Sequence, residues 1–400
     1  MKKKVFYICC VAILVLVTLT IYTNDISAIF SLPNTFYANL EEITDANENN
    51  HFGSFINLDI GKETKTSTEK YGERVVTFKL FGFIPVRKIV AKIMPEEDVY
   101  VGGNAIGISM MFDKPIVVDD SDFCKKQLIS TSFKEGDVIS KVNGTEINSI
   151  DKLVQVLQES DEDVEIEFYR NEKKHVQTYK LMNDNGVKKL GLTVKDDVSG
   201  VGTLTYVLSE SGEFGALGHQ LCDNYNTLQI VEGNIYNCNL VGIEKGQSNN
   251  PGQLKCVFVA GRNEKGDIEN SNKFGVFGKT SNVEEIVDIN KTAQLGGRLS
   301  VKPGKATIIS SVSGIREEYD IEIIRIYNQS KENDKSFVFR VTDKKLLELT
   351  GGIVQGMSGS PIMQNGKIVG AVTHVFTADP TKGFGVFTDW MLSSSEHINQ

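Results

Sequence analysis

The most informative stretch of the chain, GGIVQGMSGSPIMQNGKIVGAVTHV (residues 351–375), combines residue types that nucleophilic catalysis requires. Its segment GMSGSP (356–361) places Ser358 between two glycines, just before an expected strand. A nucleophilic serine needs backbone N–H groups aimed at the oxyanion as it forms, and a tight glycine loop brings amides close enough. We therefore predict that Ser358 is the nucleophile and that the amides of Gly356 and Ser358 form the oxyanion hole.

A nucleophilic serine also needs a base, and histidine is the usual one. The chain has five candidates: His51, His175, His219, His374 and His397. His219 ends the apolar segment FGALGH (214–219), which would place an imidazole at a strand end facing a cleft. We predict His219 as the general base. Thr373 and His374 follow Ser358 on the outgoing strand, so they either line the substrate cleft or pack in the core.

The third member of such a site is a carboxylate that fixes the histidine tautomer and stabilises the imidazolium. The candidates are Asp223, Asp288, Asp343 and Asp389. Asp343 follows an alternating strand and keeps the order His, Asp, Ser, so we predict that it takes this role. Asp223 is four residues from His219 and could brace the histidine loop instead. A zinc site is not expected, because His219 and Cys222 have H-x-x-C spacing but no second ligand pair follows.

Composition excludes several classes of protein. The 400 residues carry 43 Lys and Arg against 52 Asp and Glu, a net charge of −9, which argues against nucleic-acid binding. The hydrophobic fraction of 40% excludes wholesale disorder. Six cysteines in this length do not make a disulfide scaffold, so the fold must depend on hydrophobic cores.

The amino terminus predicts export. Three lysines precede an uncharged run over residues 5–22, and such a run would span roughly 27 Å as a helix, enough for a bilayer core. The lysines should stay cytoplasmic and leave the rest of the chain outside. We predict a signal anchor over residues 1–23. A cleaved signal peptide is the alternative, although the apolar run is long and no A-x-A site follows it.

The next segment, residues 24–95, is expected to be a polar arm with short strands. It contains DANENN (45–50) and KETKTSTEK (62–70), which are polar and weakly periodic. Two strand-like runs, 75–80 and 85–90, could form a hairpin that docks on a later domain.

Residues 96–188 predict a compact α/β module. KEGDVISKVNGTEINS (134–149) gives a strand and an Asn-Gly turn, Ser149 caps a helix with apolar residues at i, i+3, i+4 and i+7, and VEIEF (164–168) alternates as a strand. This order resembles a PDZ domain, which binds peptides by strand addition. The loop that would bind a peptide carboxylate here comprises Asn104, Ala105, Ile106, Gly107 and Ile108. It differs from the usual Gly-Leu-Gly-Phe, so binding of an internal or intramolecular peptide is also open.

From residue 189 to residue 400 the chain has many short alternating strands, which predicts a β-barrel or a pair of barrels. GMSGSP with the following Asn-Gly hairpin resembles GDSGGP of chymotrypsin-like serine proteases. The fold class that we expect is therefore mainly β: a chymotrypsin-like double β-barrel peptidase domain preceded by a PDZ domain and a transmembrane anchor.

Taken together, the anchor, the PDZ module and the segments GVGTLTYV, FGALGH, TGGIVQGMSGSPI and VGAVTHVF resemble the SpoIVB peptidases of endospore-forming bacteria. The resemblance implies the triad His219, Asp343 and Ser358, with no metal or cofactor. It also implies a serine endopeptidase that is exported to the space between the two forespore membranes and cleaves itself near its amino terminus.

The same resemblance names a protein substrate. The peptidase would cut a membrane-embedded regulator, so that a partner intramembrane protease can process a mother-cell sigma factor. The alternative function is a non-catalytic, membrane-anchored PDZ adaptor, against which the full set of Ser, His and Asp argues.

Overall fold

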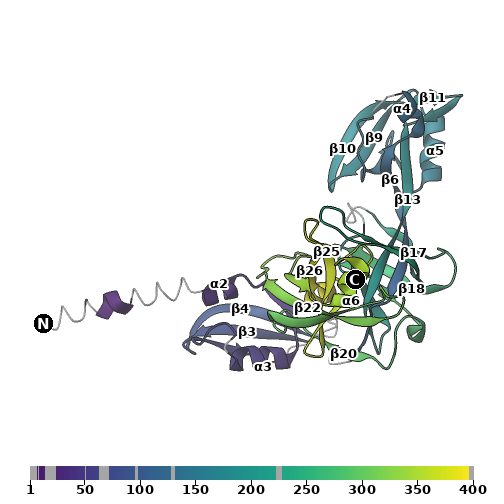
Figure 1. Cartoon of the computed structure of the whole chain (residues 1–400). Coiled ribbons are helices and arrows are strands. Elements are labelled where there is room, and N and C mark those ends of the chain that lie inside the picture. Colours follow the sequence, from purple (N-terminus) through teal and green to yellow (C-terminus); the bar gives the residue numbers. More distant parts are fainter. Residues whose placement is uncertain are drawn as a thin grey trace.

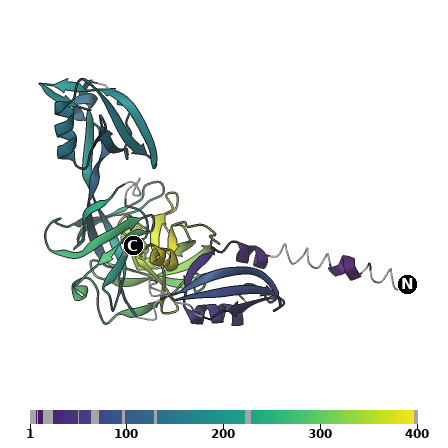
Figure 2. The same ribbon diagram turned by 180° about the vertical axis from the view of Figure 1, so that it is seen from behind.

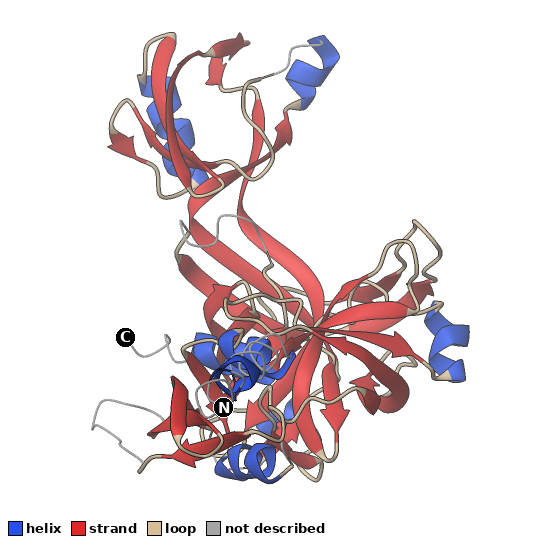
Figure 3. Ribbon diagram, turned by 90° about the vertical axis from the view of Figure 1, so that its left-hand side faces the viewer, coloured by secondary structure: helices blue, strands red, loops and turns tan. Residues whose placement is uncertain are grey.

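The chain folds into a β-rich body with one α/β domain packed against it and one α/β module projecting from it (Figures 1 and 2). This computed structural model describes residues 7, 9–13, 24–49, 51–62, 72–94, 98–127, 131–221 and 228–395. Strands dominate all three parts (Figure 3). No helix in the described part of the chain is both long and apolar enough to span a membrane. Most of the predicted anchor, residues 1–23, lies outside the described residues.

The segment predicted as a polar arm is a folded domain, so this prediction was wrong. Its elements are α2 (Asn24–Phe30), β1 (Thr35–Ala38), α3 (Leu40–Glu48), β2 (Ile56–Ile60), β3 (Glu73–Leu80) and β4 (Ile84–Ile93). The strands form one sheet in the order β1-β4-β3-β2, which confirms the hairpin. Apolar side chains that are sparse in the sequence gather on one face, where Phe36, Ile43 and Phe78 share a core. The spacing of apolar residues along the strands and along α3, and not the overall polarity of the segment, determines how it folds.

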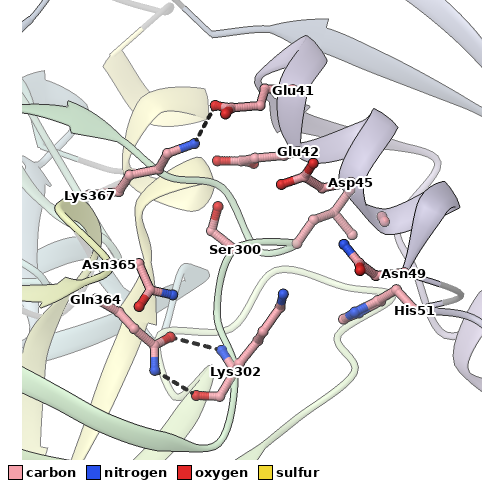
Figure 4. Close-up of a pocket in the computed structure, with 12 residues that line it drawn as sticks. Glu41, Glu42, Asp45, Asn49, His51, Ser300, Lys302, Gln364, Asn365 and Lys367 are labelled. Atoms are coloured by element: carbon pink, nitrogen blue, oxygen red, sulfur yellow. Dashed lines mark hydrogen bonds and ion pairs between the residues drawn. The ribbon is translucent and has the colours of Figure 1, made fainter.

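This N-terminal domain is fixed to the body through polar contacts around a cavity (Figure 4). The backbone N–H of Gly297 donates to both carboxylate oxygens of Glu42, at 3.0 and 3.1 Å. Lys367 pairs with Glu41 at 3.0 Å at the rim. Burial raises the pKa of Glu42 to about 6 in spite of these contacts.

The body contains two hydrophobic cores inside one closed, barrel-like arrangement of strands. The strands around the first core are β6 (Ala105–Asp120), β13 (Leu192–Leu208), β14 (Glu213–Leu217), β15 (Ile230–Asn237), β18 (Glu264–Asn272) and β19 (Gly275–Lys279). The short strand β5 (Val99–Val101) contributes Val99 and Val101 to the second core. Those around the second are β20 (Thr292–Leu295), β21 (Gly304–Ser310), β22 (Glu317–Ile326), β23 (Phe337–Val341), β24 (Pro361–Gln364), β25 (Lys367–Val375) and β26 (Lys382–Phe387). The other elements of the body are β16 (Asn239–Glu244), β17 (Gln253–Val257), η2 (Val283–Glu285), α6 (Lys344–Thr350) and α7 (Thr388–Ser395). The mainly β fold class is confirmed.

The projecting module is an insertion between two strands of the body. It comprises α4 (Asp122–Gln127), β7 (Val138–Val142), β8 (Thr145–Glu146), α5 (Ile150–Glu159), β9 (Asp163–Arg170), β10 (Lys173–Lys180), β11 (Met182–Asp184) and β12 (Val187–Lys189). The predicted helix is present, and the Ser149 side chain caps it by accepting from Lys152 N at 3.1 Å. Asn143 and Gly144 both have positive φ, 49° and 76°, as a type I′ turn requires.

The boundaries of this module differ from the prediction of residues 96–188. β6 and β13 pair from Thr203↔Ala105 to Leu192↔Asp120 and run without interruption from the body into the module. The predicted peptide-binding loop, residues 104–108, therefore belongs to the body: Asn104 Nδ2 donates to Ile286 O, and β6 pairs with both β13 and β15. Sequence order alone could not show that the first strands of the body precede the module.

Candidate active site

The predicted nucleophile lies where the two cores of the body meet. Ser358 is half-buried in the turn that precedes β24, next to Gly359 with φ +93°. A Cβ atom on Gly359 would lie 2.0 Å from Thr203 O and 2.4 Å from Leu217 N. The serine loop thus packs directly on β13 and β14, at a distance that only glycine permits.

Two threonines of β13 hold the carbonyl groups of this loop. Thr203 Oγ1 donates to Gly356 O at 2.8 Å, and the backbone N–H of Thr203 donates to Ser358 O at 2.8 Å. Thr205 Oγ1 donates to Gly359 O at 2.7 Å. Both threonine side chains are buried, so these bonds are protected from water. They turn the carbonyls of the loop toward β13.

The amides of the loop divide into two groups. Those of Met357, Gly359 and Ser360 donate to backbone carbonyls, at 3.1, 2.8 and 2.9 Å. The amides of Gly356 and Ser358 have no acceptor among the described residues. An oxyanion hole requires donors that the protein itself leaves unused. The two amides predicted from the sequence are the two that are available, although their role stays a prediction.

The two serines of GMSGSP have different environments. Ser358 Oγ donates to the backbone carbonyl of Thr373 at 3.0 Å and remains partly accessible. Ser360 is fully buried, and its Oγ has no partner in the described part of the chain. A substrate carbonyl can therefore approach Ser358 but not Ser360.

The predicted base lies beside the same strand, β25, that receives the Ser358 hydroxyl. His219 follows Gly218, where a Cβ atom would lie 3.0 Å from Val372 O. His219 Nδ1 is 2.7 Å from Gln220 O. Since a carbonyl oxygen can only accept, Nδ1 carries the proton and Nε2 keeps its lone pair. That is the tautomer a general base needs. No hydrogen bond links His219 to Ser358 among the described residues, and such bonds often form only once substrate binds.

His374 and Asp334 form a second layer around His219. The rings of His219 and His374 are 5.2 Å apart, and His374 Nε2 is 3.8 Å from Asp334 Oδ2. Burial lowers the pKa of His219, while the Gln220 carbonyl and Asp334 oppose this shift. Burial also lowers the pKa of His374, to about 4, again against the effect of Asp334. Both imidazoles are therefore neutral at pH 7.

Asp343 is not brought to His219. Its side chain caps α6 by accepting from Leu346 N at 2.9 Å and lies 3.4 Å from the N–H of Asp320. Among the described residues, Asp334 is the carboxylate whose charge opposes the lowering of the His219 pKa, and its Oδ2 lies 3.8 Å from Nε2 of the neighbouring His374. Asp334 was missed because it lies in a polar segment, KENDK (331–335), with no periodic pattern to mark it. Asp223 and Cys222 lie outside the described residues.

A cavity of about 610 Å³ opens beside the two histidines, between the body and the module. Its lining is mostly apolar and comprises Ile116, Val117, Val118, Glu135, Gly136, Val198, His219, Gln220, Leu221 and His374. Of the two predicted cleft residues, His374 lines this cavity. Thr373 is buried, with its hydroxyl 3.1 Å from Asp334 O. In the described part of the chain, no group of three or more His, Cys, Asp and Glu side chains could hold a metal ion.

The arrangement predicts a specific pH dependence for catalysis. Because the pKa of His219 is below 6.5, the neutral base should persist below that pH, and kcat/KM should fall only in more acidic solution. Asp334→Asn removes the charge that raises this pKa, so the acidic limb should move to still lower pH. The measurement is kcat/KM on a peptide substrate as a function of pH.

Asp343→Asn is the matched control, because Asn caps a helix as well as Asp does. We expect an unchanged acidic limb and an unchanged melting temperature. A loss of turnover by several orders of magnitude in Asp343→Asn, with Asp334→Asn normal, would instead establish Asp343 as the orienting carboxylate.

Comparison with known proteins places the chain in a family. Similar solved structures include the active form of the Rv3671c protease from M. tuberculosis, at 13% identity and a TM-score of 0.30, covering 50% of this chain and 74% of that one. A second is the HtrA-type protease AlgW with a decapeptide, at 14% identity and a TM-score of 0.30, covering 55% of this chain and 59% of that one. A third is the PDZ domain of an SdrC-like protein from Listeria monocytogenes, at 19% identity and a TM-score of 0.18, covering 21% of this chain and 90% of that one. No curated protein sequence matches. The family model described as SpoIVB peptidase S55 matches residues 186–392, more than half of the chain, and the protein belongs to this family.

Proposed function

We propose that the protein is a serine endopeptidase with Ser358 as nucleophile and His219 as base. The observation that carries this is the pair of unused amides, Gly356 and Ser358, flanking the one accessible serine of the loop. Membership in a peptidase family supports it.

In the proposed reaction, His219 Nε2 takes the Ser358 proton while Oγ bonds to the substrate carbonyl carbon. The two amides stabilise the resulting oxyanion. The imidazolium then gives its proton to the leaving amine as the C–N bond breaks, and water hydrolyses the acyl-enzyme by the reverse proton path. Asp334 stabilises the imidazolium electrostatically, because its charge opposes the burial that lowers the pKa of both histidines.

The biological setting that we propose follows the family. The enzyme would be attached to a membrane by residues 1–23 and would act between the two forespore membranes. There it would cut a membrane-embedded regulator of an intramembrane protease, and also itself. The uncharged run over residues 5–22 supports the attachment. Because β3 and β4 are paired in a folded domain, self-cleavage should fall outside these strands.

A fluorophosphonate probe tests the catalytic proposal directly. The full-length protein should be labelled, and mass spectrometry of its peptides should place the adduct on Ser358. Ser360→Ala should label at the wild-type rate, whereas His219→Ala should label at least a hundredfold more slowly, because the serine loses its base. Absence of labelling, or an adduct elsewhere, contradicts the proposal.

A further inference from the structure

The turn between β3 and β4 presents a bulky aromatic side chain in an unfavourable backbone conformation. Phe81 has φ +54° and Gly82 has φ +79°. A residue with a bulky side chain rarely adopts positive φ, and a turn of this kind normally has Asn or Asp at that position. Strain of this sort persists where the surrounding structure imposes it, and it frequently marks a functional position.

Four apolar side chains are exposed together at this turn. The exposed fractions are 42% for Phe81, 72% for Phe83, 43% for Ile84 and 57% for Phe55. The rings of Phe55 and Phe81 are 5.4 Å apart, and those of Phe81 and Phe83 are 6.4 Å apart. The backbone N–H of Phe81 donates to Phe55 O at 2.7 Å, which fixes the two segments to each other. We call these four residues the aromatic tip.

The aromatic tip lies on the same side of the molecule as α2, the first helix of the N-terminal domain. Figures 1 and 2 show the free end of the β3–β4 hairpin extending on the same side as α2. Arg87 of β4 holds α2 in place, because its guanidinium donates to Ile29 O at 2.6 Å and to Leu32 O at 2.7 Å. The uncharged run over residues 5–22 ends two residues before α2 begins. If the run enters a bilayer, as proposed above, that bilayer faces the side of the N-terminal domain that carries α2 and the tip.

We propose that the aromatic tip inserts into the surface of the bilayer and gives the N-terminal domain a second membrane contact. This rests on the membrane attachment proposed above. A turn that carries Phe81 and Phe83, with Phe55 packed beside them, can place three apolar rings at the acyl boundary of a bilayer. Lys88, four residues after Ile84 on β4, is exposed and can pair with lipid phosphate. A helix alone leaves rotation about its axis free, whereas two contacts fix the orientation of the domain.

The test uses the full-length protein with Ser358→Ala, so that self-cleavage cannot detach it, in vesicles of phosphatidylcholine and phosphatidylglycerol. Phe83→Trp introduces a second tryptophan, which reports on the tip. The one natural tryptophan, Trp390, is buried in the body. Replacing the phosphatidylcholine by its brominated form should lower the fluorescence of the tryptophan at position 83 at least twofold. Val241→Trp is the control, since Val241 is equally exposed, at 67%, in β16, whose partner β17 lies on the other side of the molecule (Figure 1). It should lose no fluorescence.

Each other outcome overturns the proposal. Protein that floats with the vesicles but shows equal quenching at positions 83 and 241, or none at 83, refutes insertion while leaving the membrane attachment in place. Blue-shifted, unquenched emission at position 83 that disappears on dilution shows that a second copy covers the tip. Protein that does not float refutes both the attachment and the insertion, whereas labelling of the wild type by the fluorophosphonate is unaffected.

Discussion

Ser358→Ala should lower turnover of an unfolded protein substrate by about 10⁴-fold or more, a loss typical of removing the nucleophile from a catalytic serine site. The variant should stay folded, because the lost hydroxyl makes one hydrogen bond, to Thr373 O, in a half-buried loop. We expect a cost of about 1 kcal/mol in the free energy of unfolding. The measurements are kcat/KM and a urea unfolding curve.

Ser360→Ala is the control for this experiment. Its hydroxyl is buried and has no partner in the described part of the chain, so removing it should leave activity intact and stability unchanged or slightly higher. Wild-type protein should also shorten during purification while Ser358→Ala stays at full length. Activity that survives in Ser358→Ala but not in Ser360→Ala would move the nucleophile to position 360.

What the sequence predicted well is local. The Asn143-Gly144 turn, the helix with its Ser149 cap and the glycine-rich serine loop each depend on residues within about ten positions of one another. The unused amides of Gly356 and Ser358 could also be predicted from local sequence, because a loop this tight cannot pair all of its N–H groups internally.

What it predicted poorly depends on distant parts of the chain. Residues 104–108 were predicted to be a loop, because no local pattern indicates that β6 pairs with β13, almost a hundred positions later. The order His, Asp, Ser favoured Asp343, but this carboxylate caps the helix that begins at the next residue, whereas the charge of Asp334 opposes the lowering of the His219 pKa. Asp334 also lies between His219 and Ser358 in the chain, so chain order does not distinguish the two carboxylates and only the three-dimensional structure does.

The junction between the two cores offers the second large effect. Gly359→Ala should cost roughly 3 kcal/mol in the free energy of unfolding, because positive φ is unfavourable for alanine and because the methyl group must displace backbone atoms of Thr203 and Leu217. Since the same loop carries Ser358 and the oxyanion amides, kcat/KM should fall at least a hundredfold. Urea unfolding and peptide hydrolysis measure the two effects.

Gly366→Ala separates the contact from the backbone strain. Gly366 also has positive φ, +79°, but a Cβ atom there would meet nothing within 4 Å. Gly366→Ala should lower the free energy of unfolding by only about 1 kcal/mol, because alanine is unfavourable at positive φ, and should leave kcat/KM within twofold of the wild type. If both variants lost the same stability and Gly359→Ala stayed active, the packing of the serine loop on β13 and β14 would not be what holds the catalytic amides in place. If the difference between them is about 2 kcal/mol, it measures the junction on which the proposed oxyanion hole depends.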